Sequence, residues 1–177
     1  YGIKNTLKTF HKFNSAKETP KIIRQLKEKQ TISIISDAGT PLISDPGDIL
    51  INQCIINNIA VYSIPGASSV LGSIVISGID TSKFTFLGFV PQVKKLKEEF
   101  IERIIYSNES LIIFESPKRV KKLFEEFSKE IPSRNIALIR ELTKKNEEVI
   151  RGKAEILYQN LIKRKNIKGE ITIIIDG

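Results

Sequence analysis

Short apolar runs and amphipathic segments alternate along the first half of the chain. Residues 31–35 form a β-branched run of strand length, residues 60–64 form a second predicted strand, and a loop of small residues follows each of them. Segments with helical spacing predict helices at 21–29, about 48–57 and 70–79. Two successive units of strand, loop and helix predict parallel strands joined by right-handed crossovers. The two loops are then expected to lie side by side at one edge of a sheet.

The same alternation continues after a polar break at residues 80–82. The pattern predicts strands at 83–90, 111–114, 135–140, 148–151 and 170–175, and helices at 94–106, 117–129 and 154–165. Closely spaced strands around 143–152 favour a mixed sheet in this half. We therefore predict an α/β protein with two α/β domains, residues 1–82 and 83–177.

The chain is strongly basic, with 28 Lys and Arg against 20 Asp and Glu and a formal net charge of +8. This balance favours a polyanionic partner such as nucleic acid, although a composition rich in Lys, Ile and Asn can also reflect the amino-acid usage of a whole genome. The basic run at 163–168 is typical of a solvated face. Charge alone leaves these interpretations open.

Cysteine usage and the length of the apolar runs favour a cytoplasmic protein. Cys54 is the single cysteine, so no disulfide can form within the chain, and we expect this thiol in the core. The longest apolar runs, such as 171–175, are too short to cross a bilayer. Residues 1–3 look like the middle of an element, and we expect the natural protein to begin earlier.

Several common catalytic signatures are absent from the sequence. His11 is the single histidine, which argues against a Ser-His-Asp or Cys-His set. Neither a G-x-G-x-x-G fingerprint nor a nucleotide P-loop is present. Thiolates cannot form a zinc cluster, and we expect no metal. Chemistry must then come from carboxylates, hydroxyls, basic groups, backbone amides or a bound cofactor.

The loop at residues 36–47 is the first candidate site. Ala38 and Gly39 let a ligand approach the backbone, Thr40 adds a hydroxyl, and Asp37 brings negative charge close to exposed amides. This mixture suits a ligand with cationic and anionic parts, such as an amino-acid-like or sulfonium cofactor. The alternative is that the Asp side chains of the loop only cap the turn and the next helix.

Two turns in the second half also carry charged groups. Glu115 ends a predicted strand and is placed to hold a polar ligand group, while Lys118 and Arg119 begin the next helix. Cations at a helix N-terminus are unfavourable for its dipole, so they indicate phosphate contact or a solvated surface. Arg140 and Glu141 close another strand, where an ion pair and a site are equally consistent with the sequence.

Taken together, these motifs resemble the tetrapyrrole-methylase-fold family of S-adenosylmethionine-dependent methyltransferases. Within it they are similar to the ribosomal RNA small subunit methyltransferase I branch. The matching segments follow the order of the branch over nearly the whole chain, and the long first string together with RELTK makes the resemblance specific. They are 36–47 (SDAGTPLISDPG), 64–67 (IPGA), 88–91 (GFVP), 113–119 (IFESPKR), 140–144 (RELTK), 147–152 (EEVIRG) and 169–170 (GE).

The resemblance implies a homodimer of two-domain chains with S-adenosylmethionine in the cleft between the domains. It also implies methyl transfer to the ribose 2′-hydroxyl of a cytidine in 16S rRNA, with the rRNA or the small ribosomal subunit as partner. The family's opening strand and P-x-G-N-L-like loop have no counterpart here, so an incomplete first domain is expected. The alternatives are a methyltransferase of the same fold that acts on a tetrapyrrole, or a non-catalytic RNA-binding remnant.

The resemblance also assigns roles by position. The residues expected at the cofactor are Ala38, Gly39, Thr40, Ile43, Ser68, Ser69, Glu115, Leu142 and Glu170. A base must accept the proton of the hydroxyl, and the unranked candidates are Asp37, Glu115 and Glu141. The expected contacts to RNA phosphates are Lys118, Arg119 and Arg140.

Overall fold

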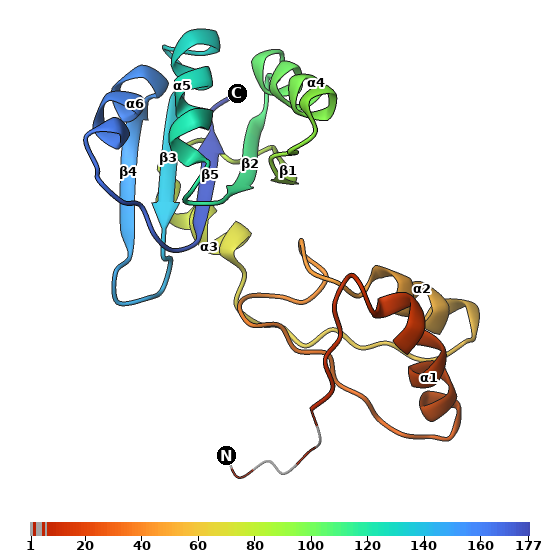
Figure 1. Ribbon diagram of the computed structural model, residues 1–177. Helices are drawn as coiled ribbons and strands as arrows, with labels where there is room; N and C mark the ends of the chain where they lie inside the picture. Colours follow the sequence, from red (N-terminus) through yellow and green to blue (C-terminus); the bar gives the residue numbers. More distant parts are fainter. Residues whose placement is uncertain (1, 3–4, 6) are drawn as a thin grey trace. The chain divides into compact units, whose positions relative to one another are not determined.

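The computed structural model of the chain describes residues 2, 5 and 7–177. It divides into two compact units, Tyr1–Ala67 and Ser68–Gly177 (Figure 1). Helix α3 (Ser69–Ser77), which the sequence analysis places in the first domain, belongs to the second unit by its contacts. The domain limits 1–82 and 83–177 stay a prediction. Residues 1 and 3, in the segment expected to be the middle of an element, lie outside the described residues.

The second unit is built on a mixed five-stranded sheet, as the spacing of the strands predicts. Its order is β1-β2-β5-β3-β4, with β1 and β2 parallel and the other neighbours antiparallel. The last strand of the chain is therefore inserted between β2 and β3. The strands are β1 (Phe84–Phe89), β2 (Ser110–Glu115), β3 (Asn135–Arg140), β4 (Glu148–Lys153) and β5 (Ile171–Ile175).

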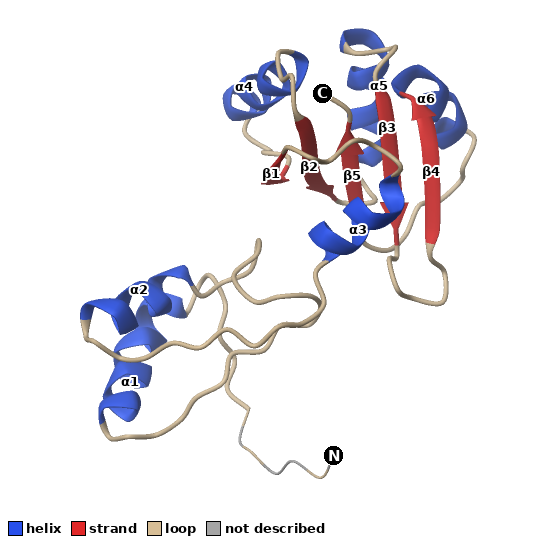
Figure 2. Ribbon diagram, turned by 180° about the vertical axis from the view of Figure 1, so that it is seen from behind, coloured by secondary structure: helices blue, strands red, loops and turns tan. Residues whose placement is uncertain are grey.

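Helices cover both faces of this sheet. On one face lie α4 (Lys94–Ile105), α5 (Val120–Glu130) and α6 (Ala154–Ile162), which share a buried core with the sheet. Helix α3 covers the opposite face, which turns to the viewer in Figure 2. Because β2, β5 and β3 are covered on both sides, they are almost continuous apolar runs.

Among its described residues, the first unit contains two helices, α1 (Ser15–Lys27) and α2 (Asp48–Ile56). They pack through a small cluster of Ile23, Leu50 and Cys54. The core position expected for Cys54 is confirmed, and burial raises the pKa of its thiol. Among the described residues, no helix is both long enough and apolar enough to cross a membrane.

The two strands predicted in the first half are wrong. Residues 31–35 and 60–64 are extended segments without ladder pairing to any described residue, and most of their side chains are exposed. β-Branched residues favour an extended backbone, but a strand also needs a neighbour whose N–H and C=O groups complete the ladder. The expected parallel sheet of this half is therefore not formed in the described part of the chain.

Candidate active site

The two small-residue loops of the first unit lie side by side, as predicted. The Thr40 Oγ1 hydroxyl donates a hydrogen bond to the Ala67 carbonyl oxygen at 2.8 Å. A Cβ atom built on Gly39 would lie 3.9 Å from the same oxygen. The loops are thus held against each other even though the strands expected before them are not formed.

The first loop has a backbone shape that leaves donor groups unused. Gly39 has a φ of 72°, in the left-handed region that glycine adopts without strain. The Ser36 hydroxyl donates to the carbonyl oxygens of Ala38 and Gly39 at 3.2 and 2.9 Å. In the described part of the chain, no group accepts a hydrogen bond from the Gly39 or Thr40 amide. Free amides in a tight turn favour an anionic ligand group.

Three further predicted residues of this loop are on the surface of the first unit. Asp37, Ala38 and Ile43 are exposed. The carboxylate of Asp37 forms no hydrogen bond or ion pair with any described residue. Asp37 is therefore available as a proton acceptor, and Ile43 offers apolar surface to a ligand.

The predicted residues at the start of α3, Ser68 and Ser69, are half-buried. Ser68 caps the helix, because its hydroxyl oxygen accepts a hydrogen bond from the Leu71 amide at 3.3 Å. One turn later, a Cβ atom on Gly72 would lie 2.9 Å from Leu142 Cδ2. The absence of a side chain at Gly72 therefore permits close packing of α3 against Leu142, and Ser68 and Ser69 precede Gly72 by about one helical turn along the chain.

Glu115 organises the turn between β2 and α5. Its side chain is buried, and Oε1 accepts a hydrogen bond from the Ser116 amide at 2.6 Å. The same oxygen forms an ion pair with Arg119 Nη2 at 2.5 Å. Arg119 also donates to Ser116 Oγ and to the Val90 carbonyl oxygen. Glu115 thus holds the backbone of this turn, and Arg119 ties the turn to Val90 after β1. The i,i+4 spacing of Glu115 and Arg119 could have indicated their ion pair.

Glu141 fastens the loop before β5. Its Oε1 accepts a hydrogen bond from the Glu170 amide at 2.9 Å, and its own amide donates to the Glu170 carbonyl oxygen at 2.9 Å. Lys144 Nζ lies 3.2 Å from Glu141 Oε1 and 3.0 Å from Glu170 Oε2. The Glu170 amide, followed by the Lys144 ammonium, lowers the pKa of Glu141. A lowered pKa makes Glu141 a weaker base.

Gly169 is the residue that makes this arrangement possible. It has a φ of 93°, and a Cβ atom there would lie 2.3 Å from Glu141 Cγ. Any side chain would therefore displace Glu141 and strain the backbone. The matching motifs at 140–144 and 169–170 are thus one structure in space, which the sequence does not reveal because they lie far apart along the chain.

Arg140, predicted to contact phosphate, is engaged within the protein. Its Nε donates to Glu148 Oε2 at 3.0 Å, and its Nη1 donates to the Lys168 carbonyl oxygen at 3.1 Å. Arg164 forms two further bonds to Glu148, each 2.7 Å long. These contacts, led by the hydrogen bonds from Arg164, lower the pKa of Glu148 to about 2. Sequence reasoning missed Glu148 and Arg164 as partners.

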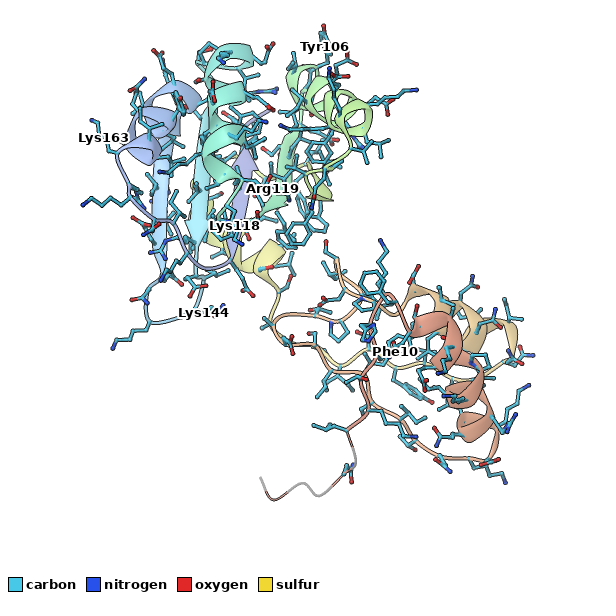
Figure 3. The ribbon with its side chains drawn as sticks, viewed as in Figure 1. Phe10, Tyr106, Lys118, Arg119, Lys144 and Lys163 are labelled. Carbon is cyan, nitrogen blue, oxygen red and sulfur yellow. The ribbon has the colours of Figure 1, made fainter. Side chains whose placement is uncertain are left out.

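The site residues of the second unit gather at one edge of its sheet. Both Glu115 and Arg140 pair with Ile171 in the strand register, so the ends of β2 and β3 meet the start of β5. Figure 3 shows Lys118, Arg119 and Lys144 around this edge. The described residues contain no group of three or more His, Cys, Asp or Glu that could hold a metal ion.

Comparison with known proteins identifies the family. The tetrapyrrole (corrin/porphyrin) methylase family matches residues 3–157. Ribosomal RNA small subunit methyltransferase I of Hydrogenobaculum sp. (strain Y04AAS1) is 40% identical over 96% of this chain and 74% of its own length. Relatives with the same name match over 60% to 79% of their own lengths.

Solved structures show the same fold at low identity. Diphthine synthase superposes with a TM-score of 0.70 at 14% identity, over 94% of this chain and 68% of its own. Uroporphyrin-III C-methyltransferase from Thermus thermophilus, complexed with S-adenyl homocysteine, has a TM-score of 0.57 at 12% identity, over 91% and 73%. The chain therefore belongs to the tetrapyrrole methylase family, in the group of ribosomal RNA small subunit methyltransferase I.

Proposed function

We propose that this protein transfers a methyl group from S-adenosylmethionine to the ribose 2′-hydroxyl of a cytidine in 16S rRNA. The observation that supports this most is the 40% identity to a ribosomal RNA small subunit methyltransferase I over nearly the whole chain. The structure adds that the motifs shared with that group, which lie far apart in sequence, build common contacts in each unit. We further propose a homodimer that acts in the cytoplasm.

The residues of the chain fit the chemical groups of S-adenosylmethionine. The amides of Gly39 and Thr40, which donate to no described group, suit its carboxylate, and exposed Ile43 suits an apolar part of the molecule. The exposed carboxylate of Glu170 can accept hydrogen bonds from ribose hydroxyls. We propose these residues, together with the others assigned by resemblance, as the cofactor contacts: Ala38, Ser68, Ser69, Glu115 and Leu142.

When bound, S-adenosylmethionine supplies an electrophilic methyl group to the 2′-oxygen. The protein then has two tasks, which are to align the reacting groups and to accept the proton of the hydroxyl. Alignment requires that the side chains and backbone around the reacting groups are held in fixed positions. Glu115 and Glu141 serve this task, because each holds backbone amides and a cation at the edge of the sheet.

Of the three candidate bases, Asp37 is the one we propose. Glu115 is buried against Arg119, and Glu141 is bound by the Glu170 amide and Lys144. The carboxylate of Asp37 is exposed and has no such partner among the described residues. Asp37→Asn is expected to lower kcat by about 100-fold or more with little change in cofactor affinity. Equal activity of Asp37→Asn and the unchanged protein would exclude this assignment.

Methyl transfer from labelled S-adenosylmethionine tests the function. The assay offers small ribosomal subunits that lack the modification and, separately, uroporphyrinogen as acceptors. We expect label in the rRNA alone. Label in the tetrapyrrole alone would instead support the substrate class named by the family description. Isothermal titration with S-adenosylmethionine checks cofactor binding independently, and an absence of binding heat would contradict the proposal.

A further inference from the structure

The positive charge of the chain is concentrated in three short segments. Residues 115–122, 140–148 and 163–170 contain eleven Lys and Arg but only five Glu, whereas the whole chain carries a net charge of +8. These three segments therefore carry most of the excess positive charge of the chain. This concentration argues against a basic composition spread evenly over the surface.

The three segments lie at the same edge of the sheet. They connect β2 to α5, β3 to β4 and α6 to β5, and Glu115, Arg140 and Ile171 are neighbours in the register. Cross-links also tie them together. Lys121 Nζ donates to the Arg164 carbonyl oxygen, and Arg140 donates to the Lys168 carbonyl oxygen. The loop at 163–170 is thus held by contacts from both of the other segments.

The cations of this edge fall into two groups. One group binds protein atoms, as described above for Arg119, Arg140, Arg164, Lys121 and Lys144. The other group consists of exposed lysines that form no ion pair with any described carboxylate. Its members in the three segments are Lys118, Lys122, Lys145, Lys163, Lys165 and Lys168. Lys122 lies within α5 and Lys163 is the C-cap of α6, so the loops themselves carry Lys118, Lys145, Lys165 and Lys168.

We propose that these four lysines, named here the basic edge, are the contacts to the phosphates of the RNA substrate. This inference rests on the proposed function, because it names the surface that receives the rRNA. It replaces Arg119 and Arg140 as phosphate ligands, since their guanidinium groups already hold the turn at Glu115 and the strand at Glu148. The bound cations keep the loops in place, and the exposed lysines meet the phosphates.

The distribution of the basic edge matches a chain of phosphates better than one small anion. The four side chains are exposed and come from three separate loops. A single phosphate is held by groups that converge on it, whereas an RNA backbone presents charges at regular intervals over a broad surface. Lysine ammonium groups on flexible stems adapt to such a target without fixed geometry.

The salt dependence of RNA binding tests the inference. The protein is titrated with a 16S rRNA transcript at several salt concentrations, as Lys118→Gln/Lys145→Gln and as Lys165→Gln/Lys168→Gln. Each lost phosphate contact lowers the slope of log K against log salt by about 0.7 to 0.9. Each double variant is therefore expected to lower the slope by about 1.4 to 1.8 and to bind about ten-fold more weakly at moderate salt.

A matched control removes two lysines from the opposite edge of the sheet. Lys83 precedes β1 and Lys153 ends β4, and both are exposed. Lys83→Gln/Lys153→Gln has the same loss of charge and is expected to keep the slope. Equal slopes for all three double variants would overturn the basic edge. Methyl transfer by the unchanged protein is measured in parallel, so failure of the proposed function is seen separately from failure of this surface.

Discussion

The two units of the chain begin from similar sequence patterns and reach different structures. In the second unit each apolar run finds a neighbouring strand, and Ile112, Ile139 and Ile174 are fully enclosed between the sheet and α3. In the first unit the runs at 31–35 and 60–64 remain exposed and unpaired within the described residues. The difference teaches that a β-branched run specifies an extended backbone, while its neighbours decide whether it becomes a strand.

The largest expected effect on the free energy of unfolding comes from shortening one side chain in the hydrophobic core of each unit. Phe124 is completely buried between α5 and the sheet, whereas Leu50 belongs to the small cluster between α1 and α2. We expect Phe124→Ala to lower the free energy of unfolding by about 3 to 5 kcal/mol and Leu50→Ala by about 2 kcal/mol. Urea unfolding with hydrogen exchange assigns each loss to a unit. A larger loss of unfolding free energy for Leu50→Ala than for Phe124→Ala would contradict this comparison of the two units.

The next effect is the pH dependence of the ion pairs. Glu148 has a pKa of about 2 in the folded protein, below its usual value of 4.5. Its contribution is complete above pH 4.5 and is lost as the pH falls toward 2, because the unfolded chain binds the proton more readily. Glu148→Gln should remove roughly 2 kcal/mol at neutral pH and flatten this acid dependence.

The first unit provides the control for this pH effect. Glu18 is paired with a single cation, Lys21 on α1, whose side chain is mostly exposed, and their hydrogen bond lowers the pKa of Glu18. Because one exposed lysine rather than two arginines holds this carboxylate, Glu18→Gln is expected to change the acid dependence of unfolding in the same direction as Glu148→Gln but by much less. Urea midpoints between pH 7 and pH 3 measure both variants. The same acid profile for Glu148→Gln and the unchanged protein would refute the role of Glu148.

A smaller effect separates two glycines. Gly169→Ala places a Cβ atom against Glu141 and keeps a positive φ, and we expect a loss of about 1 to 3 kcal/mol. In a Glu141→Ala background the clash is gone, so part of this cost should disappear. In the first unit, a Cβ atom on Gly66 would make only an ordinary contact, 3.9 Å from the Ile64 carbonyl oxygen, and Gly66→Ala should change stability by less than about 0.5 kcal/mol. Thermal unfolding of the unchanged protein and the four variants measures these differences.

The smallest effect concerns the contact between the two loops of the first unit. Thr40→Val removes the hydrogen bond to the Ala67 carbonyl oxygen but keeps the shape of the side chain. We expect a cost of about 0.5 to 1 kcal/mol. Faster amide exchange in residues 36–47 and 65–67 would accompany it. Unchanged exchange in both loops would show that the contact does not hold them together.

The fold of the second unit was largely predictable from local pattern. The strand Asn135–Arg140 has the predicted limits, because polar residues flank a fully apolar run. The insertion of β5 between β2 and β3 was not predictable, since strand order depends on contacts between distant segments. The candidate site was likewise predictable only in part, because its contacts also join distant segments. Motifs identified Glu141 and Glu170, but only the folded chain shows that they bind each other.

The identity of the methylated nucleoside tests the central claim most directly. Small ribosomal subunits that lack the modification are incubated with the protein and S-adenosylmethionine. The nucleosides of their 16S rRNA are then separated and identified by mass spectrometry. We predict one 2′-O-methylcytidine per subunit, formed at least about 100-fold more slowly when Asp37→Asn replaces the unchanged protein. A methyl group on a base, or an rRNA without any added methyl group, would contradict the proposed function.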